Sequence, residues 1–187
     1  MNIILEGRKV LLAPFSFKAD WDAFVEVHQQ DKTCKMGQFS FMLNIDPIGS
    51  RVVIENLINN GLIVWSIFTK EGKATRRVGF VYLNDVNTYS AFIQGIMDQH
   101  FARGLIKEFR KKKYTYSEDA LRTLVTFVFE KMSLQRVQAD MIESNHLAIA
   151  LLERVGFRKE GLLKKAVLLN GEAKNIVIMG LLKEEYK

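Results

Sequence analysis

The chain contains one cysteine, two prolines and no long apolar run, and these shortages exclude several classes of protein. A single cysteine, Cys34, cannot form an intrachain disulfide or a cysteine-rich zinc site, which is typical of a reducing compartment. No hydrophobic stretch reaches the roughly 18–20 residues that cross a bilayer, and residues 1–12 lack the uninterrupted apolar stretch of a signal peptide. We therefore expect a cytoplasmic protein with no membrane partner.

The remaining composition is that of one folded domain. Hydrophobic residues make up 48% and charged residues 26% of the 187 residues. Folding of a chain this long removes roughly 70% of its surface from water. No internal repeat, low-complexity tract or linker divides the sequence. We expect a single domain over residues 1–187.

Positive charge is concentrated in one segment. The net charge is +6, and residues 101–113 hold most of it, with Glu108 as the one acidic residue among six basic ones: Arg103, Lys107, Arg110, Lys111, Lys112 and Lys113. Such a concentration favours a phosphate-bearing partner, either a nucleotide-like cofactor or nucleic acid. A solvated basic loop is the alternative.

The order of the predicted elements indicates an α+β domain with a mixed, mostly antiparallel sheet flanked by helices. Apolar and β-branched runs predict strands over residues 9–12, 62–69, 78–84, 91–98, 135–142, 164–169 and 174–182. Apolar residues at helical spacing predict helices over residues 17–30, 47–60, 115–132 and 145–155. Edge strands in the last hairpin leave both a monomer and a homodimer open.

The predicted helix after Thr115 carries the strongest signal. Its apolar stripe has the helical period of 3.6 residues and comprises Leu121, Leu124, Val125, Val128, Phe129 and Met132. Thr115 and Glu118 fit a capping box, in which the threonine hydroxyl and the glutamate carboxylate each satisfy a backbone N–H. Gly156, followed by Phe157, predicts a left-handed end to the next helix.

Short motifs follow one another along the chain in a recognisable order. They are residues 6–12 (Glu-Gly-Arg-Lys-Val-Leu-Leu), Val78-Gly79, Asp119-Ala120-Leu121, Arg136-Val137, Asn145, residues 154–157 (Arg-Val-Gly-Phe), Glu160-Gly161 and Gly171. In this order they resemble the GNAT superfamily of acetyl-CoA-dependent N-acetyltransferases. Within it they are most similar to the RimJ/RimL branch, which acetylates the N-termini of ribosomal proteins.

The resemblance implies a splayed sheet in which two central strands part to admit the pantetheine arm of acetyl-CoA. Here those strands are residues 91–98 and 135–142, with N–H groups near Ile96 and Met97 available to the thioester carbonyl. A fixed donor to a developing oxyanion contributes about 3 kcal/mol in well-studied acyl transfers. Gly95 is compatible with a bulge, with a close backbone approach, or with an ordinary glycine in a strand.

The family holds the cofactor pyrophosphate in a Gln/Arg-x-x-Gly-x-Gly/Ala loop at a helix N-terminus. The aligned residues 110–115 keep the arginine and lack both glycines, whereas Arg103-Gly104 upstream keeps the arginine and one glycine. Either side-chain charge replaces the lost amides, or the loop serves another surface. The cofactor-binding residues implied are Ile96, Met97, Arg103, Gly104, Arg110, Lys111, Lys112, Lys113, Thr115, Tyr116, Ser117 and Asn145.

The chemistry requires a base for the acceptor amine and an acid for the leaving thiolate. Asn145 matches the family's asparagine, but Ala148 stands where the branch often has a serine. The candidate acids are Tyr116, Tyr114 and Tyr82, and the candidate bases are Glu143, Asp85 and His100. Three scattered histidines and one cysteine give no metal-ligand spacing, so we expect no metal.

Two functions from different classes follow. The first is an enzyme that moves an acetyl group directly from acetyl-CoA to a primary amine, either a protein N-terminus or a small-molecule amine. The absence of an acidic cluster in the sequence disfavours polyamines and aminoglycosides. The second is a catalytically degenerate GNAT-like module that binds nucleic acid or another anionic partner through the basic loop 101–116, whose aromatic residues can stack on bases.

Overall fold

The computed structural model describes residues 3–30, 46–70, 75–98, 111, 114–169 and 171–187. These residues form an eight-stranded sheet in the order β1-β2-β3-β4-β5-β6-β8-β7. The strands are β1 (Leu5–Glu6), β2 (Val10–Pro14), β3 (Ile63–Thr69), β4 (Arg77–Asn84), β5 (Ser90–Met97), β6 (Arg136–Ile142), β7 (Arg158–Leu169) and β8 (Glu172–Leu182). The helices are α1 (Phe17–Gln30), α3 (Pro47–Asn59), α5 (Tyr116–Glu130), α6 (His146–Val155) and the short η1 (Lys183–Glu185).

The predicted α+β class and the mostly antiparallel sheet are confirmed, since only β5 and β6 pair in parallel. Two strands differ most from the prediction. β1 was missed because two residues carry no periodic signal. β7 begins six residues earlier than the predicted residue 164, because its first half is an exposed edge whose charged residues do not alternate with apolar ones. No described helix is long and apolar enough to cross a membrane.

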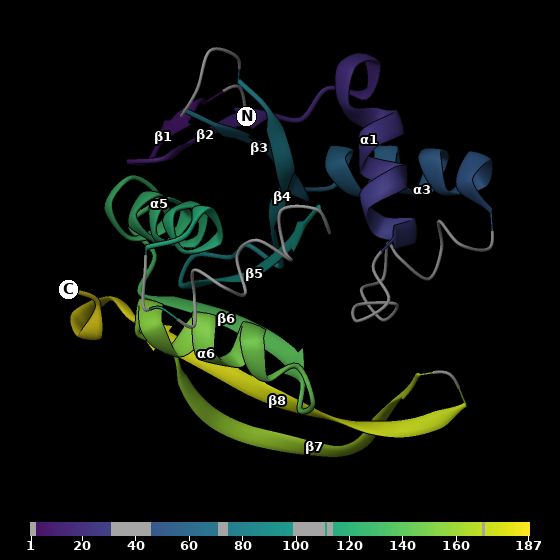
Figure 1. Ribbon diagram of the computed structural model, residues 1–187. Coiled ribbons are helices and arrows are strands. Elements are labelled where there is room, and N and C mark those ends of the chain that lie inside the picture. Colours follow the sequence, from purple (N-terminus) through teal and green to yellow (C-terminus); the bar gives the residue numbers. More distant parts are fainter. Residues whose placement is uncertain (1–2, 31–45, 71–74, 99–110, 112–113, 170) are drawn as a thin grey trace.

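Helices cover the two sides of the sheet, α5 and α6 on one and α1 and α3 on the other (Figure 1). We call these the α5 face and the α1 face. The alternation of side chains along β5 assigns its residues to the two sides: Ala91 and Ile93 lie in the α5-face core, and Ile96 lies in the α1-face core. On β6, Val137 and Ala139 belong to the α5-face core.

Helix ends agree with the sequence, with one exception. Gly156 adopts the left-handed conformation at φ 119°, and the Phe157 N–H donates to the Leu152 carbonyl at 3.0 Å. The Thr115 hydroxyl accepts the Glu118 N–H at 3.2 Å, which confirms half of the predicted capping box. The other half is wrong, because the Glu118 carboxylate pairs with Arg122 and Arg154 rather than with the Thr115 backbone.

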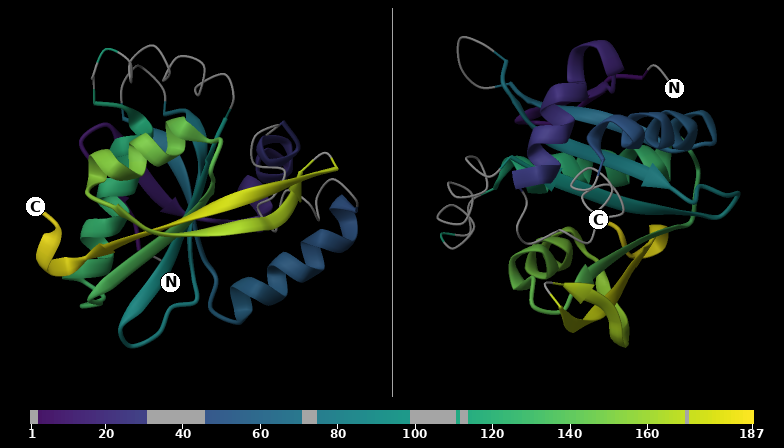
Figure 2. Two further views of the ribbon diagram at one scale, coloured as in Figure 1. Left: turned by 90° about the horizontal axis from the view of Figure 1, so that it is seen from below. Right: turned by 90° about the vertical axis from the view of Figure 1, so that its right-hand side faces the viewer.

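The parallel strands β5 and β6 pair at only three positions. Ser90, Ala91 and Phe92 lie opposite residues 136–138, and the register ends there. Beyond this point β5 continues to Met97 along β4, while β6 continues to Ile142 along β8. The right-hand view of Figure 2 shows the strands on either side of this point as two separate groups. The predicted parting of these two strands is therefore present.

The backbone approach at Gly79 is much closer than that at Gly95, where an added Cβ would lie 3.4 Å from the Phe80 carbonyl oxygen. The pairing of β4 with β5 runs through Gly95 without a shift, so the bulge considered there is absent. At Gly79 an added Cβ would lie 2.2 Å from the Ile96 carbonyl oxygen and 2.9 Å from the Met97 Cα. Because both atoms are backbone, they cannot move without displacing the end of β5.

Gly79→Ala is expected to lower the free energy of unfolding by about 3 kcal/mol, because overpacking here strains the backbone of two strands. Urea denaturation measures the loss. Gly161→Ala is the matched control, since its nearest contact would be an ordinary 3.9 Å from Ile178. We expect that variant to stay within about 1 kcal/mol of the parent. Equal effects of the two substitutions would contradict the close approach.

Candidate active site

The Met97 amide points into the space between the parted strands. The Asp98 N–H donates to the Val78 carbonyl at 2.9 Å, so this pair is a hydrogen-bonded one. Antiparallel pairing alternates, so the Ile96 N–H also faces β4, whereas those of Gly95 and Met97 face away from it. Of the two amides predicted to meet a thioester carbonyl, only that of Met97 is on the open side.

The N-terminus of α5 lies at the same end of the sheet as Met97. The strand registers align Val10 with Thr69, and Gly79 with Met97, at one end of the strands. α5 begins at that end of the strands because Asp119 accepts the backbone N–H groups of Lys9 at 2.7 Å and Val10 at 3.0 Å. First-turn amides, here those of Tyr116 and Ser117, have no acceptor within the helix and favour an anion.

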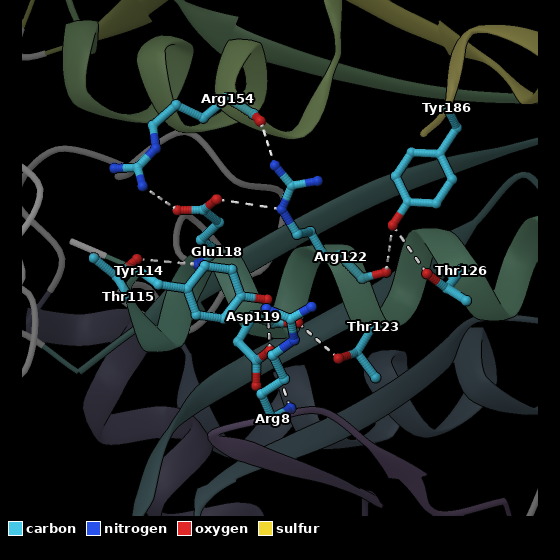
Figure 3. Close-up of polar contacts among 10 residues, drawn as sticks. All are labelled: Arg8, Tyr114, Thr115, Glu118, Asp119, Arg122, Thr123, Thr126, Arg154 and Tyr186. Carbon is cyan, nitrogen blue, oxygen red and sulfur yellow. Dashed lines mark hydrogen bonds and ion pairs between the residues drawn. The ribbon is translucent and has the colours of Figure 1, made fainter. Parts of the chain in front are cut away.

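The two carboxylates in the first turn of α5 bind groups on other parts of the protein rather than at the N-terminus of the helix (Figure 3). Asp119 is 2% exposed and also accepts the Arg8 N–H at 3.2 Å and the Tyr114 hydroxyl at 2.7 Å. Glu118 pairs with Arg122 Nε at 3.2 Å and with Arg154 Nη2 at 2.5 Å. Their charges are therefore engaged inside the protein.

Two cations that the sequence analysis did not assign to the phosphate site lie beside the N-terminus of α5. The Arg8 guanidinium lies 5.6 Å from the centre of the Tyr114 ring, and the Lys9 ammonium lies 5.5 Å from that of Tyr116. Both residues lie in the turn between β1 and β2, more than a hundred residues before α5 in the sequence. Lys111 is exposed nearby in the chain. The other predicted phosphate ligands, Arg103, Gly104, Arg110, Lys112 and Lys113, lie outside the described residues.

The candidate acids occupy three different environments. Tyr116 is half-buried against the α5-face core. Burial, followed by the hydrogen bond to Asp119, holds the pKa of Tyr114 far above its usual range, which does not suit a proton donor at neutral pH. Tyr82 is buried on the α1 face, 3.0 Å from His28 Nε2.

Asn145 begins α6 at the open end of β6. Its Oδ1 accepts the Ala148 N–H at 3.3 Å, and its Nδ2 donates to the Met141 sulfur at 3.4 Å. The predicted asparagine is thus a helix cap held next to the parted strands.

Of the candidate bases, Asp85 and Glu143 lie at opposite ends of the sheet, and His100 lies outside the described residues. Asp85 follows β4 at the end of the sheet where β5 and β6 are still paired, so that candidate is wrong in position. Glu143 follows β6 at the open end, is exposed, and accepts a hydrogen bond from Asn175 Nδ2 at 2.8 Å. Asp140, on β6 itself, was not considered. Its signal was present in the sequence as a polar position alternating with Ala139 and Met141.

A family model described as the acetyltransferase (GNAT) domain matches residues 9–158. The chain belongs to the GNAT acetyltransferase family. Among curated relatives of this GNAT chain, the probable N-acetyltransferase YjcK of Bacillus subtilis strain 168 is 29% identical over 94 residues, 50% of this chain and 46% of that protein. The putative ribosomal N-acetyltransferase YdaF of the same strain is 34% identical over 83 residues, 44% of each chain. The chain thus spans about half the length of these relatives.

Solved structures share the GNAT fold over nearly the whole chain. A GNAT acetyltransferase from Bacillus anthracis gives a TM-score of 0.73 at 19% identity and covers 98% of this chain and 100% of that one. A chimera of the spermidine N-acetyltransferase SpeG from Vibrio cholerae gives 0.74 at 17%, covering 95% and 97%. RimL, the ribosomal L7/L12 acetyltransferase, solved with coenzyme A, gives 0.71 at 16%, covering 96% and 98%. These identities show the fold and not the RimJ/RimL branch.

The described residues contain no group of three or more histidine, cysteine or carboxylate side chains able to hold a metal ion. The donor set at the open end of β5 and β6 suits a thioester with a diphosphate instead. It combines a backbone N–H, a helix N-terminus and two nearby cations.

Proposed function

We propose that the protein transfers the acetyl group of acetyl-CoA to a primary amine by direct attack of the amine on the thioester. One observation carries the proposal: the gap between β5 and β6 opens at the sheet end where α5 begins. An amide donor for a thioester carbonyl and an anion-binding helix start therefore stand together on one side of the molecule.

Each residue has a proposed part. The Met97 N–H donates to the thioester oxygen as negative charge develops on it. The first-turn amides at Thr115, Tyr116 and Ser117 bind the pyrophosphate, together with Arg8, Lys9 and the lysines from Lys111 onward. Asn145 lines the gap at the start of α6. Tyr116 is the proposed proton donor to the leaving thiolate, and a carboxylate at the open end of β6 takes the proton of the amine.

We propose a protein N-terminus, as in the RimJ/RimL branch, as the acceptor. The name of YdaF supports this choice, whereas the SpeG structure shows that the same fold also serves a polyamine. The nucleic-acid-binding alternative depended on residues 101–116, most of which lie outside the described residues. The family match does not favour it.

The acceptor assignment predicts that a peptide with a free N-terminal alanine is acetylated at least about tenfold faster than spermidine, because a polycation loses affinity beside the cations at the site. Release of the coenzyme thiol, followed with a thiol reagent, gives both rates. The same peptide with its N-terminus already acetylated is the matched control and should release no thiol above background. Faster turnover of spermidine would contradict the assignment.

A further inference from the structure

The α1 face of the parted strands carries a carboxylate at Asp140. Ala139 lies in the α5-face core and Met141 packs against it, so the alternation of side chains directs Asp140 to the opposite face. Asp140 lies two residues past Gln138, the last β6 residue paired with β5. It therefore stands where the two strands have just separated.

The registers define what surrounds Asp140 on this face. Continuing the parallel pairing by two residues places Gln94 of β5 across the gap from Asp140. Gln94 in turn pairs with Tyr82 of β4, whose hydroxyl meets His28 of α1 at 3.0 Å. On the other side, Asp140 pairs with Ile178 of β8. Polar side chains thus follow one another across the sheet to Asp140, whose other neighbour is apolar. We call His28, Tyr82, Gln94 and Asp140 the polar row.

The cation on this face of β6 is already neutralised. Arg136, on the same face of β6, donates from Nη1 to Glu160 Oε1 at 2.9 Å, makes a second bond to that carboxylate, and donates to Gln138 at 3.1 Å. Among the described residues, no other side chain forms an ion pair or hydrogen bond with the Asp140 carboxyl, whose only hydrogen-bond donor there is its own backbone N–H. Burial outweighs that backbone hydrogen bond and raises the pKa of the Asp140 carboxyl.

We propose that Asp140 is the catalytic base that takes the proton of the acceptor amine, which approaches from the α1 face while the thioester is held from the α5 face. This inference rests on the proposed acetyl transfer. Glu143 is less suited to the role because it is exposed and its carboxylate is bonded to Asn175. A half-buried carboxylate that no other described side chain binds is the better acceptor of a proton.

The step balances without a further reactant. The Asp140 carboxylate takes one proton from the ammonium group, directly or through one water, and leaves a neutral amine. The amine nitrogen forms a bond to the thioester carbonyl carbon, and the carbon–sulfur bond breaks. Tyr116 gives its hydroxyl proton to the leaving thiolate and regains one from the surplus proton of the nitrogen, and Asp140 releases its proton to solvent.

Asp140→Asn keeps the shape of the side chain and removes its basicity. At neutral pH we expect the variant to lose about 100-fold or more in kcat for peptide acetylation. The loss should shrink at alkaline pH, where the amine is already neutral. Tyr82, His28, Arg136 and Glu160 are the other titratable groups described in or beside the polar row, and all four are present in both proteins. Calorimetry should show unchanged binding of acetyl-CoA to the variant.

Two further variants and one physical measurement sharpen the test. Glu130→Gln, an exposed carboxylate at the far end of α5, is the matched control and should keep parental activity. Glu143→Gln should lose less than Asp140→Asn. Because burial penalises the charged form of Asp140, the asparagine variant should melt at the parental temperature or above it.

The outcomes separate the two proposals. Parental kcat and pH profile in Asp140→Asn, an equal loss at every pH, or a pH-dependent loss in Glu143→Gln alone would each overturn the role of Asp140. If neither the parent nor the variant binds acetyl-CoA, the proposed function fails and this inference fails with it.

Discussion

Saturating acetyl-CoA is expected to raise the melting temperature of this protein by about 5–10 °C. A ligand that binds only the folded state, at about 100 times its Kd, adds about 2.7 kcal/mol to the free energy of unfolding. In a chain of this size each kcal/mol moves the midpoint by about 2–4 °C. Scanning fluorimetry with and without millimolar acetyl-CoA measures the shift. An unchanged midpoint would count against acetyl transfer itself.

The same measurement tests whether basic side chains replace the missing loop glycines. Replacing Lys111, Lys112 and Lys113 together by alanine should reduce the shift, because these side chains are proposed to contact the pyrophosphate. The matched control replaces three exposed lysines away from the start of α5, namely Lys18, Lys183 and Lys187, and removes the same charge. If both triple variants respond to acetyl-CoA alike, these three lysines contribute nothing to binding the diphosphate.

Asp119→Ala should lower the free energy of unfolding by about 3–5 kcal/mol, because it leaves buried donors without an acceptor. The carboxylate accepts three backbone N–H groups from residues 8–10 and the Tyr114 hydroxyl. It thereby joins the start of β2 to the first turn of α5. Urea denaturation measures the change. Binding of acetyl-CoA should weaken as well, because α5 would no longer be held at that end of the strands.

The matched control is Asp22→Ala, since Asp22 is an exposed carboxylate on α1. That variant is expected to stay within about 0.5 kcal/mol of the parent. A parental unfolding midpoint for Asp119→Ala would show that the four hydrogen bonds contribute nothing to the position of α5.

Local patterns predicted most elements because each pattern depends on neighbours along the chain. α5 was predicted from an apolar stripe with the period of a helix, and Leu124, Val125 and Val128 are indeed fully buried. α6 ended at Gly156 because glycine adopts a positive φ without a steric penalty. The predicted capping box was wrong at Glu118 because its carboxylate binds a residue that is distant in the sequence. Arg154 lies 36 positions further along the chain, and no local pattern reveals it as a competing partner.

The amino-acid sequence by itself determined the class of fold, the family and the pair of strands that part. Hydrophobic periodicity and ordered motifs are properties of neighbouring residues, and they can be read without coordinates. Only the tertiary structure decided which groups face the gap. Arg8 and Lys9 reach the start of α5, and Asp140 rather than Asp85 reaches the open end, because strand register and the alternation of faces act between segments far apart in the chain.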